Sequence, residues 1–285
     1  MGAGPAGLTA ATYLGRFRRK VLVLDGGRPR AARIPQSHNT PGFPSGIGGP
    51  ALLQNMADQA VLYGAERRTA VAEAMTRTED GFQLRVTDGD GEAELSARFV
   101  LLATGVVDRL PALDNLEAAI AAARVRMCPI CDAYEAIDQG IAVLGDGDLG
   151  AREAAFLTTY SKDVTLLHLG ASPAPDARGF AARPIDLAQL SVSAGGIELA
   201  GPAGRTFDCL YLALGCEMQS RLAVRWGAAH DEDGNLVVDA HQQTSIDGLY
   251  AAGDVVRGLN QIAVAAAEAA IAATDIHRRL RAQSC

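Results

Sequence analysis

The sequence has little of what marks an exported, membrane-spanning or nucleic-acid-binding protein. Its 285 residues include only five cysteines, too few and too scattered for a disulfide-rich scaffold. The net charge of -7 is unsuited to neutralising nucleic-acid phosphates. The longest apolar stretch, residues 261–273, is shorter than the ~20 residues of a membrane-spanning helix and includes Glu268. Near the N-terminus the basic residues follow the apolar ones, the reverse of a signal peptide. We therefore expect a cytoplasmic protein that binds neither nucleic acid nor membrane. Its length predicts about two domains.

Glycine, in contrast, is abundant, with 31 residues, and it recurs in two loops that match G-x-G-x-x-G. A helical stretch to about Gly15 and an apolar run ending at Asp25 follow the first loop. The second lies between an expected strand at residues 141–144 and an expected helix to about Tyr160, with another strand at 164–167. Such glycines allow a tight turn and let backbone N–H groups approach a pyrophosphate. The alternative is that both loops are only tight turns, but two such units in one chain predict two dinucleotide-binding sites. The six glycines are Gly2, Gly4, Gly7, Gly145, Gly147 and Gly150.

The two loops differ in their surroundings. Asp25 ends its strand 18 residues after Gly7, at the spacing of an acid that binds a ribose hydroxyl. After the second unit the corresponding residues are His168, Leu169 and Gly170, so neither an acid nor an arginine pair stands there. The first loop also requires a preceding strand, and only Met1 precedes it. We therefore expect the true start of the chain to lie upstream.

A cysteine pair, Cys128 and Cys131, forms a C-x-x-C motif that is followed directly by Asp132. Two sulfurs at this spacing can close a small disulfide or resolve a mixed one. A carboxyl beside them can pass a proton to a leaving thiolate. A structural zinc site would need two more ligands, and Cys209 and Cys216 have no histidine beside them. Buried inert thiols are the other alternative, and redox chemistry without a metal is the prediction. For Cys209 and Cys216 we expect a place in the core, and for Cys285 a place in the C-terminal tail.

Several motifs occur together in one order along nearly the whole chain. They are the first glycine loop with Asp25, the loop from His38 to Pro44, Ala103-Thr104-Gly105, the C-x-x-C-D segment, the second glycine loop, and Gly253-Asp254 through Asn260-Gln261. In this combination the chain resembles the low-molecular-weight thioredoxin reductase family of flavoproteins. The cysteine pair lies in the second, nicotinamide-type domain, as in that family, and no cysteine precedes it.

The resemblance implies an α/β fold of two Rossmann-like, three-layer dinucleotide-binding domains, the second inserted in the first. Residues 1–106 and 235–285 would form the FAD-binding domain, and residues 107–234 the NAD(P)-binding domain with the cysteine pair. Within the second domain, Gly145, Gly147 and Gly150 would bind the nicotinamide nucleotide. The residues expected at FAD are Gly2, Gly4, Pro5, Ala6, Gly7, Asp25, Asn39, Thr104, Gly105, Gly253, Asp254, Gln261 and Ile262.

The implied activity is electron transfer from NADPH or NADH through FAD to Cys128–Cys131, and on to a thioredoxin-like protein or a small disulfide. Asp132 would be the proton-donating acid, and the family implies a homodimer. His168-Leu169-Gly170 stands in place of a basic HRR-type element, which leaves the nicotinamide preference open. Two other departures, Ala133 in place of Gly and Asn260 in place of Arg, are typical of a divergent relative of the family. The other readings are a dithiol oxidase that passes electrons from a small dithiol to oxygen, and a flavin-binding redox sensor.

Overall fold

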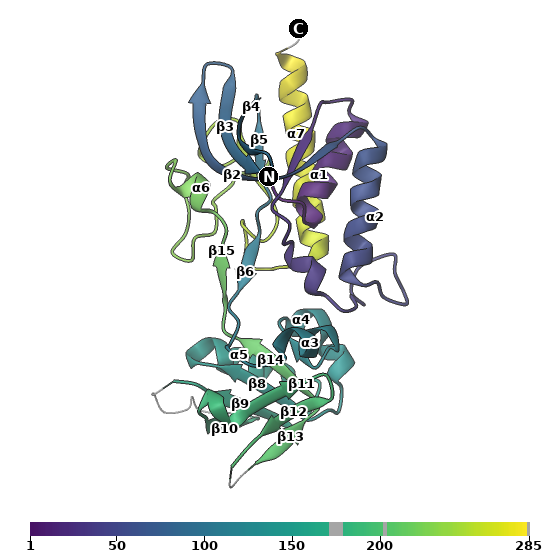
Figure 1. Ribbon diagram of the computed structural model, residues 1–285, viewed down its shortest axis with the longest axis vertical. Coiled ribbons are helices and arrows are strands. Elements are labelled where there is room, and N and C mark those ends of the chain that lie inside the picture. The colour runs from purple at the N-terminus through teal and green to yellow at the C-terminus, as the bar shows by residue number, and fades with distance from the viewer. Residues whose placement is uncertain (171–178, 202–203, 284–285) are drawn as a thin grey trace. The chain divides into compact units, whose positions relative to one another are not determined.

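The computed structural model describes residues 1–170, 179–201 and 204–283, so Cys285 lies outside the described residues. The chain divides into two compact units (Figure 1). Unit 1 comprises residues 1–32, 49–107 and 218–285, and unit 2 comprises residues 33–48 and 108–217. These units differ from the expected domains at three places, because residues 33–48 belong to unit 2 and residues 107 and 218–234 belong to unit 1. Among the described residues, no helix is long and apolar enough to cross a membrane.

Unit 1 contains a parallel sheet region, an antiparallel extension and the longest helix of the chain. Its elements are α1 (Pro5–Arg16), β1 (Leu22–Asp25), α2 (Gly49–Leu62), β2 (Glu66–Thr78), β3 (Gly81–Asp88), β4 (Gly91–Ala97), β5 (Val100–Leu102), α6 (Arg221–Val224), β16 (Leu249–Ala251) and α7 (Ile262–Ala282). Short η1 (Arg30–Arg33), β6 (Val106–Asp108) and β15 (Cys216–Met218) contain boundaries between the units. Strand β1 pairs in parallel with β2, β16 in parallel with β5, and β2, β3 and β4 are antiparallel.

The first residues of the chain connect these strands. The amino group of Met1 donates to the carbonyl of Leu101 (2.7 Å), and the N–H of Ala103 donates to that of Met1 (2.8 Å). The N–H of Gly2 donates to the carbonyl of Leu24 (2.8 Å). Met1 and Gly2 therefore lie between β1 and β5, the position that the fingerprint assigns to the end of a strand before the glycine loop.

Apolar side chains cover both faces of this sheet. On one face, small residues of α1 and α7 form a core with Tyr250 and Ala252. Because alanines line both helices, their backbones approach closely. On the other face, β2 to β4 pack with residues 223–256 around Phe82, Leu102 and Leu249. The Asp-Gly-Asp-Gly segment at residues 88–91 forms the turn of the hairpin between β3 and β4, in which Asp88 pairs with Gly91.

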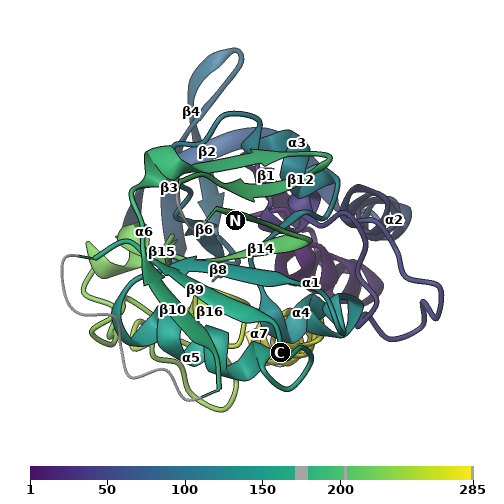
Figure 2. The same cartoon turned by 90° about the horizontal axis from the view of Figure 1, so that it is seen from below.

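Unit 2 is built on a five-stranded, all-parallel sheet in the order β10-β9-β8-β14-β7 (Figure 2). The elements are α3 (Leu116–Ala121), β7 (Val125–Arg126), α4 (Pro129–Asp132), η2 (Ala133–Ala136), β8 (Ile141–Gly145), α5 (Gly147–Leu157), β9 (Val164–His168), β10 (Ala181–Pro184), η3 (Leu187–Gln189), β11 (Leu190–Ser193), β12 (Gly196–Leu199), β13 (Arg205–Phe207) and β14 (Cys209–Ala213).

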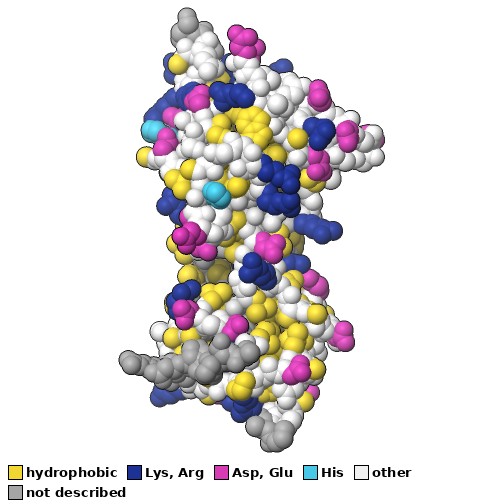
Figure 3. All heavy atoms as spheres, turned by 90° about the vertical axis from the view of Figure 1, so that its left-hand side faces the viewer, with side chains coloured by type: hydrophobic (Ala, Val, Ile, Leu, Met, Phe, Trp, Pro, Cys, Tyr) yellow, Lys and Arg dark blue, Asp and Glu magenta, His cyan; other side chains and the backbone are white. Residues whose placement is uncertain are grey.

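Alternate residues of the central strands point to opposite faces of this sheet. Ile141 and Val143 pack with α5 and η2, whereas Ala142 and Leu144 pack with α3 and the antiparallel sheet β11-β12-β13. Unit 2 therefore has three layers. On the face drawn in Figure 3, acidic and basic side chains are mixed, with hydrophobic side chains between them.

Candidate active site

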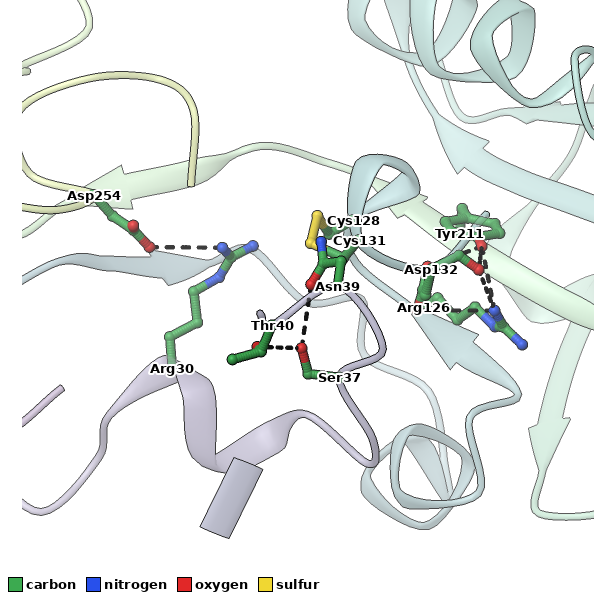
Figure 4. The surroundings of a disulfide bond; sticks show 10 residues. All are labelled: Arg30, Ser37, Asn39, Thr40, Arg126, Cys128, Cys131, Asp132, Tyr211 and Asp254. Atoms are coloured by element: carbon green, nitrogen blue, oxygen red, sulfur yellow. Dashed lines mark hydrogen bonds and ion pairs between the residues drawn. A yellow bond between two sulfur atoms is a disulfide. The ribbon is translucent and has the colours of Figure 1, made fainter. Parts of the chain in front are cut away.

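The predicted cysteine pair forms a disulfide at the start of a helical turn in unit 2. Cys128 stands at the N-cap of α4 and is bonded to Cys131, with the two Cα atoms 5.3 Å apart. The N–H of Cys131 donates to the carbonyl of Cys128 (2.9 Å). Pro129 is the first residue of the turn, where its fixed φ angle suits a helix. Both cysteines are half-buried, so the disulfide is held by the turn and remains accessible (Figure 4).

The carboxyl of Asp132 meets two side chains from the neighbouring strands (Figure 4). The hydroxyl of Tyr211 on β14 donates to Oδ1 of Asp132 (2.9 Å). Nη1 of Arg126 on β7 donates to the backbone carbonyl of Asp132 (2.7 Å) and lies 3.9 Å from its Oδ2. Tyr211 and Arg126 are register partners in the parallel pair of β14 and β7. The sheet thus places a donor and a positive charge on the predicted acid.

The buried position of Asp132 raises the proton affinity of its carboxyl. Burial raises its pKa from 3.8 to about 6, and the charge of Arg126 and the hydrogen bond from Tyr211 oppose part of that rise. The side chain of Arg126 is only 9% exposed, so its positive charge is poorly screened by solvent. Asp132 consequently exchanges its proton close to neutral pH, as a group that donates protons to thiolates should.

The remaining described cysteines do not join the pair. Cys209 is buried on β14, and burial raises the pKa of its thiol to about 11, which leaves it almost fully protonated. Cys216 is half-buried on β15. Among the described residues, no group of three His, Cys, Asp or Glu side chains could hold a metal ion.

The first glycine loop has two crowded glycines and one open one. A Cβ on Gly2 would lie 2.1 Å from the carbonyl oxygen of Ala103, and a Cβ on Gly7 would lie 1.9 Å from that of Gly2. A Cβ on Gly4 would meet nothing within 4 Å. Gly4 is also the N-cap of α1, which begins at Pro5 and Ala6. The outer glycines therefore allow the turn and the packing, and the middle one leaves space at a helix N-terminus, as a pyrophosphate requires.

The other residues expected at FAD lie mostly in unit 1, at the carboxyl ends of β1, β5 and β16. Asp25 ends β1 and accepts the N–H of Gly27 at Oδ1 (2.8 Å). Thr104 and Gly105 follow β5, and the hydroxyl of Thr104 donates to the carbonyl of Gln219 (2.7 Å). Asn39 is the exception. It belongs to unit 2, where its Oδ1 accepts from Ser37 (3.2 Å), and Figure 4 draws it beside the disulfide.

The turn after β16 is held by a buried acid on α7. The N–H of Gly253 donates to Oε2 of Glu268 (2.8 Å), and Glu268 is 4% exposed. A Cβ on Gly253 would lie 3.1 Å from that of Ala6, so this turn touches the start of α1. Asp254 lies 3.7 Å from Nη1 of Arg30 (Figure 4). Helix α7 begins beside it, with Gln261 at its N-cap and Ile262 as its first residue.

The second glycine loop, in unit 2, repeats the geometry of the first. A Cβ on Gly145 would lie 2.9 Å from the Cα of Gly150, whereas a Cβ on Gly147 would meet nothing within 4 Å. Gly147 has a φ of 52°, a conformation that favours glycine, and it opens α5. The residues present thus fit a second pyrophosphate at the end of β8.

Two strand–glycine turn–helix units with an open middle glycine, and a half-buried disulfide with an acid beside it, define a class of protein, the nucleotide-dependent disulfide oxidoreductases. The family model described as "Pyridine nucleotide-disulphide oxidoreductase" matches residues 1–269, and the chain belongs to this family. It is accordingly a flavoenzyme, an NAD(P)H:disulfide oxidoreductase with FAD and a nicotinamide nucleotide as cofactors.

Comparison with individual proteins supports this family assignment. The chain is 34% identical to the thioredoxin reductase of Streptomyces coelicolor over 289 residues, which cover 94% of this chain and 88% of that protein. It is 33% identical to the bifunctional thioredoxin reductase/thioredoxin of Mycobacterium leprae over 98% of this chain and 65% of that protein. The thioredoxin reductase structure from Streptococcus pyogenes matches with a TM-score of 0.85 and 24% identity, covering 99% of this chain and 96% of that one. The predicted α/β fold with two Rossmann-like domains is confirmed.

Sequence reasoning missed three residues that hold the predicted ones in place: Tyr211, Arg126 and Glu268. No pattern in the sequence distinguishes Tyr211 and Arg126 from other residues of a strand. Glu268 carried a signal, because it is the one acid in an apolar stretch at the start of α7. A charge among alanines on a buried helix face predicts a polar partner inside the core.

Proposed function

We propose that this protein is a thioredoxin reductase-like enzyme that reduces a disulfide of a thioredoxin-like protein through Cys128 and Cys131. The observation that carries the proposal is the half-buried disulfide next to Asp132, whose pKa of about 6 suits proton transfer near neutrality. The names of the relatives from Streptomyces coelicolor and Mycobacterium leprae support the choice of acceptor.

In this proposal unit 1 binds FAD at Gly2, Gly4, Gly7, Gly253 and Asp254, and unit 2 binds the nicotinamide nucleotide at its own glycine loop. The bound cofactors supply a hydride from NAD(P)H and deliver its electron pair to the disulfide. The protein supplies the two sulfurs and the proton, and its fold holds the sulfurs and the proton donor in position.

The chain's own residues perform the thiol chemistry. Reduction of Cys128–Cys131 consumes two electrons and two protons and gives two thiols. One thiolate then attacks the acceptor disulfide, and the other displaces it from the mixed disulfide, which restores the Cys128–Cys131 bond and releases the acceptor as a dithiol. Asp132 protonates a leaving thiolate and is reprotonated from solvent. Tyr211 and Arg126 orient its carboxyl throughout.

A small-molecule dithiol oxidase is the second candidate. In that reaction electrons enter from the dithiol through Cys128–Cys131 and leave through FAD to oxygen. The end of β9 favours it, because His168, Leu169 and Gly170 include neither an acid nor an arginine pair that would bind the adenosine ribose of a nicotinamide nucleotide. In either case we propose a homodimer that acts in the cytoplasm, where thioredoxin systems keep thiols reduced.

An anaerobic titration of the purified holoenzyme tests the proposal. NADPH and NADH are added separately while the flavin absorbance is followed, and an oxidised thioredoxin is then added. Bleaching by either nucleotide, followed by recovery on adding thioredoxin, is the expected result. Bleaching by a dithiol alone would instead assign the oxidase reaction.

Cysteine variants provide the control. Cys128→Ser and Cys131→Ser should still bleach with the nucleotide but should lose reduction of thioredoxin by at least ~10³-fold, because neither can form the internal disulfide. Cys209→Ala removes a buried thiol of the same unit that the mechanism does not use, so its activity should stay near that of the wild type. Thioredoxin reduction that survives in both serine variants would contradict the proposed route.

A further inference from the structure

The carboxylate of Asp146 lies across the end of β9, although Asp146 belongs to the glycine loop after β8. Its Oδ1 accepts the N–H of Gly147 (2.7 Å), which makes Asp146 the N-cap of α5. The same oxygen lies 2.8 Å from Nε2 of His168, the last residue of β9. A Cβ built on Gly170 would lie only 2.2 Å from this oxygen. Because Gly170 has no side chain, the carboxylate of Asp146 can lie against its backbone.

The end of the second strand is where dinucleotide folds distinguish their ligands. An acid at that place binds the 2′-hydroxyl of the adenosine ribose in NADH, whereas arginine accommodates the 2′-phosphate of NADPH. In this chain His168, Leu169 and Gly170 supply neither. The loop residue Asp146 brings a carboxylate to the place that the strand itself leaves without one.

We propose that Asp146 selects the nucleotide, accepting a hydrogen bond from the ribose 2′-hydroxyl of NADH and repelling the 2′-phosphate of NADPH. This inference rests on the proposed function, in which unit 2 binds the nicotinamide nucleotide. It assigns a specificity role to a residue outside the three glycines of the motif.

The two oxygens of the Asp146 carboxylate have different roles. Oδ1 accepts the N–H of Gly147, which positions the side chain, and lies 2.8 Å from Nε2 of His168. Within the described part of the chain, no donor is recorded on Oδ2, and the side chain is 59% exposed. Oδ2 is therefore available to a ribose hydroxyl. His168 is 1% exposed, so this neighbour of Oδ1 is shielded from solvent and leaves the outer oxygen exposed.

Asp146→Asn is the informative variant. An asparagine oxygen still caps α5, because Asn and Asp are about equally good N-caps, but the negative charge is gone. Asp148→Asn is the matched control, since it removes an exposed acid from the first turn of the same helix. If only the summed charge of this region mattered, the two variants would behave alike.

The test measures the dissociation constants of NAD⁺ and NADP⁺ for the oxidised holoenzyme by calorimetry, together with the rates of flavin reduction by NADH and NADPH. The wild type should bind NAD⁺ about tenfold or more tightly than NADP⁺, the factor expected for a hydrogen bond to a charged group. Asp146→Asn should reduce that ratio about tenfold, by weakening NAD⁺ binding and tightening NADP⁺ binding. Asp148→Asn should leave it within about twofold.

Three results would overturn the inference, and they separate it from the proposed function. A wild type that prefers NADP⁺, or an Asp146→Asn ratio equal to that of Asp148→Asn, refutes the role of Asp146 while the reductase reaction stands. Binding of neither nucleotide, by a holoenzyme whose flavin a dithiol still bleaches, removes the nicotinamide route and the inference with it.

Discussion

The hydroxyl of Tyr211 offers the sharpest test of how the active-site acid is tuned. It donates to Oδ1 of Asp132 over 2.9 Å and so favours the ionised carboxylate. The variant Tyr211→Phe removes this hydrogen bond. Burial then raises the pKa of Asp132 further, because only the charge of Arg126 still opposes it. Because a hydrogen bond to a charged group contributes about 1.5–3 kcal/mol, and one pKa unit corresponds to about 1.4 kcal/mol, the pKa of Asp132 should rise by about 1 unit or more.

The direction of the effect on activity follows from the sign of that shift. With a pKa of about 6, Asp132 is protonated in about one molecule in ten at pH 7, and with a pKa near 7 in about one in two. The step that needs its proton should therefore persist to higher pH. In Tyr211→Phe the alkaline limb of the kcat/KM profile for thioredoxin reduction should move up by about 1 pH unit.

The assay compares pH profiles of the wild type, Tyr211→Phe and Tyr160→Phe from pH 5 to 9. Tyr160 belongs to the same unit and packs against the same core, but its hydroxyl makes no recorded hydrogen bond among the described residues. Infrared titration of the carboxyl band in Asp132→Asn and Tyr211→Phe then assigns the limb to this carboxyl. An unmoved limb in Tyr211→Phe, or an equal shift in Tyr160→Phe, would refute the reasoning.

Two further predictions concern the FAD site that we propose for unit 1. Glu268→Ala leaves the buried N–H of Gly253 without its acceptor, at a cost of about 1–3 kcal/mol, so the purified protein should contain less FAD and release it at a lower temperature. Glu268→Gln, which retains an acceptor oxygen, should lie between this variant and the wild type, and equal losses would argue against the hydrogen bond. Gly7→Ala should lower the melting temperature of the FAD-free protein, because its Cβ would meet the carbonyl of Gly2 at 1.9 Å. Gly4→Ala should leave that temperature unchanged yet weaken FAD binding, and the reverse pattern would show that the two glycines have been given the wrong roles.

The sequence was most informative where a strand, a glycine turn and a helix follow one another directly. Such units, as in β8–α5–β9, are predictable because their apolar runs and their turn glycines are recognised within a few residues of one another. The helices expected after the two glycine loops, up to about Gly15 and up to about Tyr160, correspond to α1 and α5. The antiparallel sheet β11-β12-β13 was not predicted. Its strands have three or four residues, and polar side chains such as Ser191, Glu198 and Thr206 alternate in them.

The site was predictable where spacing along the chain determined it. Cys128 and Cys131 are neighbours on one turn, so their pairing needed no knowledge of the fold. Tyr211 stands 79 positions after Asp132 and reaches it only because β14 lies between β8 and β7 in the sheet. Asp146 reaches the end of β9 for a related reason, since β8 and β9 are adjacent and parallel. Strand order is a property of the whole sheet, and a local pattern does not contain it.

The packing of α1 against α7 has a consequence for how the protein is made. About 250 residues separate Arg16 from Ile262, so at 5–20 residues per second α1 waits about 10–50 s for its partner. The alanine face of α1 and the edge of β5 stay uncovered during that interval. The strands of the five-stranded sheet of unit 2 end at residue 213, so they are all synthesised well before α7. We therefore expect the nascent chain to complete its second unit first, with the α7-facing side of α1 among the last surfaces to be buried.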